Sequence, residues 1–292
     1  MTHRPMLRPM RLLLRLVRVR DLALAERYFR GVPAGSVIPT PLFGHTLPLD
    51  VSRSTTHRLL CLQQERFIAE RGLVGALARP GDCVVDVGAN IGYYLLLFQS
   101  RVGAAGRVVC VEPEPTNLGE LRRCIAANGF SNVELLAAAA GAARGEVVLR
   151  EGLNGRVETG GGEGRTVPMI PLDSLCDRRP ALVKIDIEGF EGQALAGMAQ
   201  MLGTLAPALF VEVHPRLLNY GYAVRDVVGL AQPHYARVEF WEPADQGSLI
   251  QRLRARYCSS RAVRRIVDEA ALLADCDTGR RTDPFWMICR RA

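Results

Sequence analysis

The sequence predicts an α/β fold in which a central, mostly parallel sheet is flanked by helices. The first observation is a short apolar run, Cys83 to Val87, that ends in two glycines, Gly88 and Gly92, and passes directly into an apolar segment of helical character. The second is that further short apolar runs alternate with amphipathic stretches along the chain after it. Such alternation is typical of parallel sheets joined by crossover helices.

The glycine turn after Val87 has the form of a nucleotide-type site. Glycines let the backbone approach a ligand closely, and the following helix offers unpaired N–H groups at its start. The spacing of Gly88 and Gly92 is one glycine short of the dinucleotide fingerprint. We expect the carboxylate of Asp86 to point into the mouth of the same crevice, where it would repel a diphosphate. S-adenosylmethionine carries an ammonium group and a sulfonium but no phosphate, so it is the cofactor that this turn predicts.

The next apolar run ends in Glu112, which comes 24 positions after Gly88. A carboxylate there can accept both hydroxyls of a ribose, as it does at the roughly 20-residue spacing of the dinucleotide folds. We expect Asp86 and Glu112 to contact the methionine and ribose parts of the cofactor, while the remaining residues shape the turn. The predicted cofactor site is therefore Asp86, Gly88, Asn90, Gly92 and Glu112.

A second group of polar residues accompanies a later apolar run. Lys184 and Asp186 are two positions apart on a predicted strand, so both side chains leave the same face. Charges on a central strand are costly unless they are paired or used. Glu188 follows at the carboxyl end of this strand, where ligands bind in open α/β sheets, and the next strand delivers Glu212 and His214 to the same end. The structural alternative is an ion pair of Lys184 with Asp186 or Glu212.

These residues carry a family resemblance. Between residues 65 and 215, four blocks in this order and spacing resemble the FkbM family of S-adenosylmethionine-dependent methyltransferases: residues 86–94, Glu112-Pro113, residues 183–191 and residues 211–215. The resemblance implies a class I methyltransferase fold, which is Rossmann-like, and O-methylation of a hydroxyl on a sugar, a glycan or a polyketide-type small molecule. The alanines at 137–140 depart from the family, which often has a polar side chain near the end of the third strand. We therefore expect the adenine to be recognised by backbone groups or by residues elsewhere in the chain.

Methyl transfer from a sulfonium requires alignment of the acceptor oxygen and removal of its proton. His214 is the candidate general base, because an unperturbed imidazole has a pKa near neutral pH. Asp186, Glu188 and Lys184 are expected to orient the acceptor or support the base. A variant of this scheme makes Asp186 a ligand for a divalent ion, but no metal is expected, because only one carboxylate cluster supports it. Lys184 is the single lysine among 37 basic residues, which favours a role that arginine cannot fill, as a compact donor or a group with a tunable pKa.

The net charge of +7 belongs to the ends of the chain. Residues 1–30 hold eight arginines against two acids and residues 250–292 hold ten against five, so the middle of the chain has a net charge of −4. Because a nucleic-acid enzyme lines its site with positive charge, we expect a small-molecule or glycan acceptor and no nucleic acid. The alternatives are an N- or RNA-directed methyltransferase and a non-catalytic protein that retains the cofactor fold for binding or as a scaffold. Eight cysteines without a Cys-x-x-Cys pair indicate a reducing, cytoplasmic location and neither zinc nor disulfides.

The ends of the chain are predicted to be separate from the catalytic body. Residues 1–48 are interpreted as an extension, with a basic amphipathic helix over 1–30 and a Pro/Gly connector from Gly31 to Pro48, and residues 49–292 as the methyltransferase domain. The helix is expected to pack on its own domain or a partner, and peripheral contact with an anionic membrane surface is the alternative. Residues 54–77 and 248–274 are predicted to be helical, and the glycine-rich stretch 151–166 to be a mobile loop, either a hairpin tip or a lid.

Overall fold

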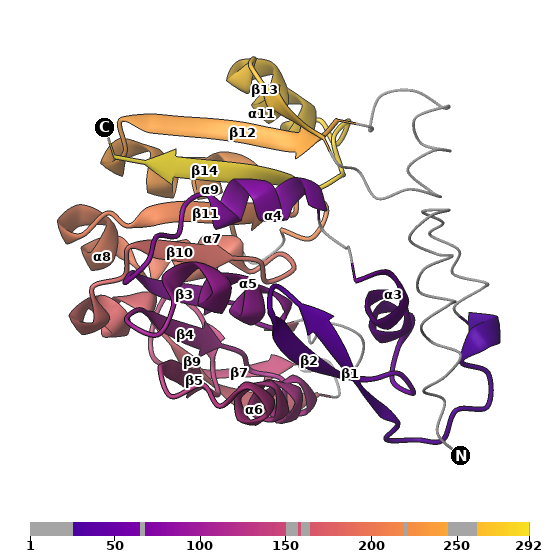
Figure 1. The fold of residues 1–292 in the computed structure, drawn as a ribbon. Coiled ribbons are helices and arrows are strands. Elements are labelled where there is room, and N and C mark those ends of the chain that lie inside the picture. The colour runs from indigo at the N-terminus through magenta and orange to yellow at the C-terminus, as the bar shows by residue number, and fades with distance from the viewer. Residues whose placement is uncertain are drawn as a thin grey trace.

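The computed structural model describes residues 26–64, 68–149, 157–158, 164–218, 221–244 and 262–291. Its main feature is an eight-stranded sheet with helices on both faces (Figure 1). In spatial order the strands are β13 (Val263–Ile266), β12 (Arg237–Pro243), β14 (Phe285–Arg290), β11 (Ala208–Val213), β10 (Leu182–Ile185), β3 (Cys83–Val87), β4 (Arg107–Val111) and β5 (Val133–Leu136).

The five strands from β5 to β11 run parallel, and β14, β12 and β13 add antiparallel neighbours at one edge. The chain builds outward from β3 through β4 to β5, and then continues on the other side of β3 with β10. The strand order therefore reverses between β3 and β10, which is where open α/β sheets bind their ligands, outside the carboxyl ends of the strands. The predicted α/β fold of class I methyltransferases is confirmed.

Both faces of the sheet are apolar, because alternate residues of each central strand point in opposite directions. On β3, Val84 belongs to one core and Val85 to the other. The first core is completed by α3 (Thr55–Gln63), α4 (Ile68–Gly75), α5 (Tyr93–Val102) and α6 (Pro115–Asn128), and the second by η1 (Leu172–Arg178), α7 (Glu191–Ala196), α8 (Ala199–Thr204), α9 (Val224–Ala231) and α11 (Glu269–Asp277). A 3-10 turn, η2 (Gln232–His234), follows α9.

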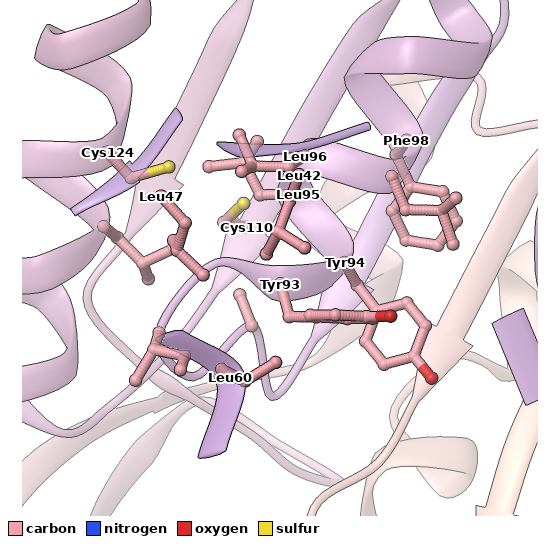
Figure 2. Packing of buried hydrophobic residues seen from close by; sticks show 14 of the residues in the cluster. Leu42, Leu47, Leu60, Tyr93, Tyr94, Leu95, Leu96, Phe98, Cys110 and Cys124 are labelled. Carbon is pink, nitrogen blue, oxygen red and sulfur yellow. The ribbon is translucent and has the colours of Figure 1, made fainter. Parts of the chain in front are cut away.

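Two smaller sheets accompany the main one. Four short strands form the order β6 (Ala139–Ala140), β9 (Arg165–Ile170), β7 (Gly145–Leu149) and β8 (Val157–Glu158). Near the beginning of the described chain, β1 (Val37–Leu42) and β2 (His45–Asp50) form an antiparallel hairpin. Leu42 and Leu47 of this hairpin belong to the first core, with Leu60 of α3 and Tyr93 of α5, as Figure 2 shows.

The prediction of a connector from Gly31 to Pro48 was wrong where these two strands lie. Pro39 lies opposite Pro48 in the register. In a two-stranded ribbon alternate N–H groups face away from the partner strand, so prolines spaced by two positions do not break the pairing. The turn has positive φ at both Phe43 (52°) and Gly44 (83°), the backbone that closes tight hairpins. The predicted domain boundary between residues 48 and 49 stays a prediction.

Two predicted helices also differ from the structure. The stretch 54–77 forms two helices, α3 and α4, among its described residues. In the stretch 248–274, residues 262 onward contain strand β13 and then α11, which begins at Glu269, while 248–261 lie outside the described residues. Most of the predicted amphipathic helix over 1–30 and of the loop over 151–166 also lies outside them. Among the helices that are described, none combines the length and apolar character needed to cross a bilayer.

Candidate active site

The glycine turn is pressed against the end of a neighbouring strand. Gly88 has φ of 80°, and a Cβ atom at this position would lie 2.0 Å from the carbonyl oxygen of Asp186. The N–H of Gly88 donates to the carbonyl of Val111 at 2.9 Å. Asn90 has φ of 49°, and Gly92, with φ of 91°, is the N-cap of α5. Only glycine satisfies both the backbone conformation and the close approach at position 88.

Glu112 is fixed at the carboxyl end of β4. It is 5% exposed and accepts the backbone N–H groups of Asn90, at 2.8 Å, and Glu114, at 3.0 Å. The amide of Asn117 donates to it at 3.3 Å. Burial raises the pKa of Glu112 above its ordinary value, while these three hydrogen bonds act in the opposite direction. The carboxylate therefore holds one position in the cavity wall.

Asp86 and Lys184 form a buried ion pair. They are direct neighbours in the parallel register of β3 and β10, and Lys184 Nζ lies 3.2 Å from Asp86 Oδ1 and 3.5 Å from Asp186 Oδ2. Asp86 is 0% exposed and Lys184 is 1% exposed. The ammonium group also lies 4.6 Å from the centre of the Tyr94 ring, within the range of a cation–π contact.

The position of Asp86 differs from the expectation that it points into the mouth of the crevice. Its carboxylate lies behind Lys184 and does not line the cavity, because the strand register turns it toward the lysine. Burial alone would lower the pKa of Lys184, but the charges of Asp86 and Asp186 outweigh it and raise the pKa above its ordinary value. Lys184 thus stays charged, which favours the compact donor over the group with a tunable pKa.

His214 follows β11 and is oriented by a carboxylate at the start of α7. Its Nδ1–H donates to Glu191 Oε1 at 2.7 Å, and Glu191 is 0% exposed. The backbone N–H of Gly189 donates to the same oxygen at 3.0 Å. His214 Nε2 lies 3.9 Å from Glu212 Oε1. Glu191 therefore fixes the ring so that Nε2 faces the carboxyl ends of the central strands.

The ionisation of His214 differs from that of a free imidazole. Burial alone would lower its pKa, but the hydrogen bond to Glu191 and the charges of Glu191, Glu212 and Asp186 raise the pKa to about 9. Without a bound cation, His214 is therefore protonated at neutral pH and is not ready to accept a proton. A positive charge entering beside it would lower the pKa again, because like charges disfavour the protonated form.

One cavity of about 330 Å³ is lined by residues of both the predicted cofactor site and the predicted catalytic set. Its lining includes Gly88, Asn90 and Glu112 from the cofactor set and Lys184, Asp186, Glu188 and His214 from the catalytic set. Asp86 and Gly92 are not among its lining residues. Ala138, Ala139 and Ala140 also line it, so the wall after β5 offers backbone groups and methyl groups.

Several lining residues were missed or left open by sequence reasoning. They include Glu70 of α4 and Thr56 and Leu60 of α3. Tyr94 was read as part of the motif, but its position beneath Lys184 was not foreseen. The partnership of Glu191 with His214 was missed as well. The only available signal was that both flank the carboxyl ends of neighbouring strands.

The cavity is acidic. Its lining holds the carboxylates of Glu70, Glu112, Asp186, Glu188 and Glu212, against the side chains of Lys184 and His214. Burial, followed by the charges of Asp186 and Glu70, raises the pKa of Glu212 well above its ordinary value. Converging carboxylates of this kind favour a positively charged ligand.

The strand order and the glycine turn are those of the class I methyltransferase fold, and the cavity lies at the carboxyl ends of its strands. The sequence matches the family described as the methyltransferase FkbM domain over residues 86–245. The chain belongs to this family, as its motifs predicted. No curated protein matches the sequence.

Solved structures of methyltransferases resemble the chain at a low level. An FkbM methyltransferase from Methylobacillus flagellatus shares 21% identity over 63% of this chain and 49% of its own, with a TM-score of 0.39. An S-adenosylmethionine-dependent O-methyltransferase from Thermotoga maritima shares 11% identity over 89% of this chain and 78% of its own, with a TM-score of 0.41. The chain spans about half the length of the first of these proteins. At such scores the family assignment rests on the sequence match.

Proposed function

We propose that the protein is an O-methyltransferase that transfers the methyl group of S-adenosylmethionine to a hydroxyl of a sugar, a glycan or a polyketide-type small molecule. The observation that carries this proposal is the placement of Asp186, Glu212 and His214 in the same cavity as the glycine turn. The turn and Glu112 hold the methyl donor. The acceptor hydroxyl meets the carboxylate and imidazole groups at the ends of β10 and β11, where its proton is taken up.

The protein takes little covalent part in the methyl transfer. The acceptor oxygen forms a bond to the methyl carbon while the carbon–sulfur bond breaks, and the electron pair stays on sulfur as S-adenosylhomocysteine. Alignment of the two reacting atoms supplies most of the rate that such a displacement gains. Glu188, which has φ of 54°, and Lys184 line the same cavity and orient the acceptor.

The acidic lining argues against the alternative of an RNA-directed enzyme. Nucleic acids are bound through their phosphates by arginine and lysine, and Lys184 is already surrounded by Asp86 and Asp186. A non-catalytic scaffold is also disfavoured, because the buried partner of His214 would serve no purpose in a fold that only binds. The acidic lining suits a neutral or cationic acceptor.

The proposal is tested by cofactor binding and then by transfer. Titration of the full chain with S-adenosylmethionine in a calorimeter should show one site, and Glu112→Gln should weaken it at least tenfold. Radiolabelled cofactor is then offered with hydroxylated sugars and polyketides in parallel with total RNA. Label found only in RNA would overturn the acceptor class, and no cofactor binding at millimolar concentration would overturn the proposal itself. His214→Ala should retain cofactor binding and lose turnover.

A further inference from the structure

Three side chains converge at the carboxyl ends of β10 and β11. Asp186, Glu212 and His214 each offer one ligand atom, and these atoms lie within 4.8 Å of one another. Adjacent ligands of an octahedral divalent ion are roughly 3 Å apart, given bonds of about 2.1 Å. Asp186 and Glu212 are partly exposed, with 28% and 21% of their side-chain area accessible. Small rotations of these two side chains can therefore close the distance.

A second observation concerns Nε2 of His214, which faces the two carboxylates. His214 is 6% exposed, its Nδ1–H is taken by Glu191, and Nε2 makes no hydrogen bond to any other described residue. A buried carboxylate that accepts from one nitrogen sets the tautomer and leaves the lone pair of the other nitrogen for a metal, an arrangement that supports most metal-bound histidines. The sulfonium of the cofactor cannot accept this lone pair.

The charges around the cluster also favour a cation. Asp86 of β3 is paired with Lys184 of β10, and Oε1 of Glu191 of α7 accepts from the ring of His214. Asp186, which Lys184 also contacts at 3.5 Å, and Glu212 line the same cavity as His214. Two neighbouring carboxylates repel each other, and a cation bound between them removes this repulsion.

We propose that Asp186, Glu212 and His214 Nε2 bind a divalent cation that in turn binds the acceptor. Two carboxylates and one imidazole suit an ion such as Mg²⁺ or Mn²⁺ and leave coordination positions open. An acceptor with two adjacent oxygens, such as a vicinal diol, would fill two of them. This inference rests on the proposed function, and it assigns His214 the role of ligand in place of general base.

The cation has a defined task in the reaction. Bound to it, the acceptor hydroxyl loses its proton more readily, and the proton passes to water. The oxygen lone pair then forms the bond to the methyl carbon, and the electrons of the carbon–sulfur bond stay on sulfur. The cation also orients the oxygen, because two adjacent acceptor oxygens on one ion leave little rotational freedom.

The test measures Mn²⁺ binding to the full chain after treatment with a chelator and dialysis. The fall of the free Mn²⁺ signal in electron paramagnetic resonance should give one site per chain, and Mg²⁺ should compete for it. Asp186→Asn, Glu212→Gln and His214→Gln should each weaken Mn²⁺ binding at least tenfold. The matched controls are Glu146→Gln and His234→Gln, because both residues are exposed and neither lines the cavity. They should bind Mn²⁺ as the unchanged protein does.

Thermal unfolding provides a readout that does not depend on turnover. Mn²⁺ should raise the Tm of the unchanged protein and of both controls, and should leave the Tm of Glu212→Gln unchanged. Without Mn²⁺, Glu212→Gln should be at least as stable as the unchanged protein, because it relieves repulsion with Asp186; this outcome shows that the variant is folded.

Two outcomes would overturn the cation site. One is that the unchanged protein binds no Mn²⁺ at millimolar concentration, with and without S-adenosylhomocysteine. The other is that the three cavity variants bind it as the controls do. Cofactor binding is titrated on the same samples, so a protein that binds the cofactor and no Mn²⁺ would refute this inference and leave the proposed function standing. A protein that binds neither would refute both.

Discussion

Lys184 contacts charged or aromatic groups both behind the cavity and in its lining. It neutralises Asp86 behind it, contacts Asp186 beside it and lies over the ring of Tyr94. A guanidinium is longer and planar, so it would not fit between two carboxylates on adjacent strands. The charge of the lysine therefore has mainly a structural role, which is to stabilise the end of β10 where this strand lines the cavity.

Replacing Lys184 by methionine should destabilise the protein by about 3 kcal/mol, because Asp86 is left buried without its counter-charge. Burial already raises the pKa of Asp86 above its ordinary value, and without the lysine its folded-state pKa rises further. A carboxyl that is protonated in the folded state contributes stability that is lost as pH rises above its unfolded pKa. The free energy of unfolding lost through Lys184→Met, measured with urea, should thus be smaller at pH 5 than at pH 8. The double variant Lys184→Met with Asp86→Asn should recover most of the stability, and a loss equal to that of Lys184→Met alone would contradict the pairing.

Gly88→Ala should abolish tight cofactor binding, because the added methyl group meets the carbonyl oxygen of Asp186 at 2.0 Å. The turn must then move away from β10, and we expect the Kd for S-adenosylmethionine to rise more than tenfold in calorimetric titration. Gly81→Ala is the matched control, since Gly81 has φ of 87° and nothing within 4 Å of the added atom. It should lose about 1 kcal/mol of stability from backbone strain and bind the cofactor normally. Equal Kd values for the two variants would refute the packing argument.

At the scale of elements, α3 forms part of the cavity wall through Thr56 and Leu60. The helix is fixed to α6 by a buried network, in which His57 Nε2 lies 2.8 Å from Glu120 Oε2. Arg53 pairs with the other oxygen of Glu120, and Ser54 Oγ lies 2.6 Å from His57 Nδ1. Glu120 is 1% exposed. The wall of the cavity therefore depends on an ion pair that lies outside it.

Glu120→Gln should lower stability by about 1–3 kcal/mol, the usual cost of weakening a buried charged hydrogen bond. Burial would raise the pKa of Glu120, but the hydrogen bonds and charges of His57 and Arg53 outweigh it and lower the pKa. A carboxyl with a lowered folded-state pKa contributes stability above its unfolded pKa of about 4.3, and this is lost as pH falls. The difference in unfolding free energy between the unchanged protein and Glu120→Gln, measured with urea, should have its full size at pH 6 and become smaller below pH 4. Glu146→Gln is the control, and a difference that does not change with pH would contradict the ion pair.

At the scale of the whole molecule, the first core joins the N-terminal hairpin to the catalytic sheet. Leu47 and Leu49 of β2 are buried in the same cluster as Leu95 of α5 and Val84 of β3. Asn128, the last residue of α6, accepts the N–H of Thr46 at 2.8 Å. The hairpin thus packs as part of the body that carries the site.

Leu49→Ala should cost about 2–5 kcal/mol, the usual range for emptying a buried leucine site. The loss should appear in a single cooperative transition by fluorescence and circular dichroism, because the hairpin and the sheet share one core. Val37→Ala is the control, since Val37 is 42% exposed, and it should change stability by less than about 0.5 kcal/mol. A separate early transition for the hairpin would show that it unfolds independently of the sheet.

Much of this arrangement could be predicted from local patterns. The strand–turn–helix at Gly88 and the carboxylate of Glu112 follow from apolar runs and glycine spacing, which depend on neighbours in the chain. The hairpin β1–β2 could not be predicted in this way, because its prolines read as a connector until the pairing of Pro39 with Pro48 shows that they lie opposite each other. The helix predicted over 248–274 was wrong for Val263–Ile266 because pairing with β12 turned that stretch into an edge strand.

The chain alone predicted the α/β fold, the methyl donor and the family, because these predictions depend on spacings within single strand–turn–helix units. Tertiary structure decided which charges meet. The register of β3 and β10 places Lys184 against Asp86, so the aspartate faces the lysine instead of the cavity. The packing of α7 against the end of β11 gives His214 its partner Glu191 and raises its pKa. Such pairings depend on which strands become neighbours, and no local sequence pattern records that.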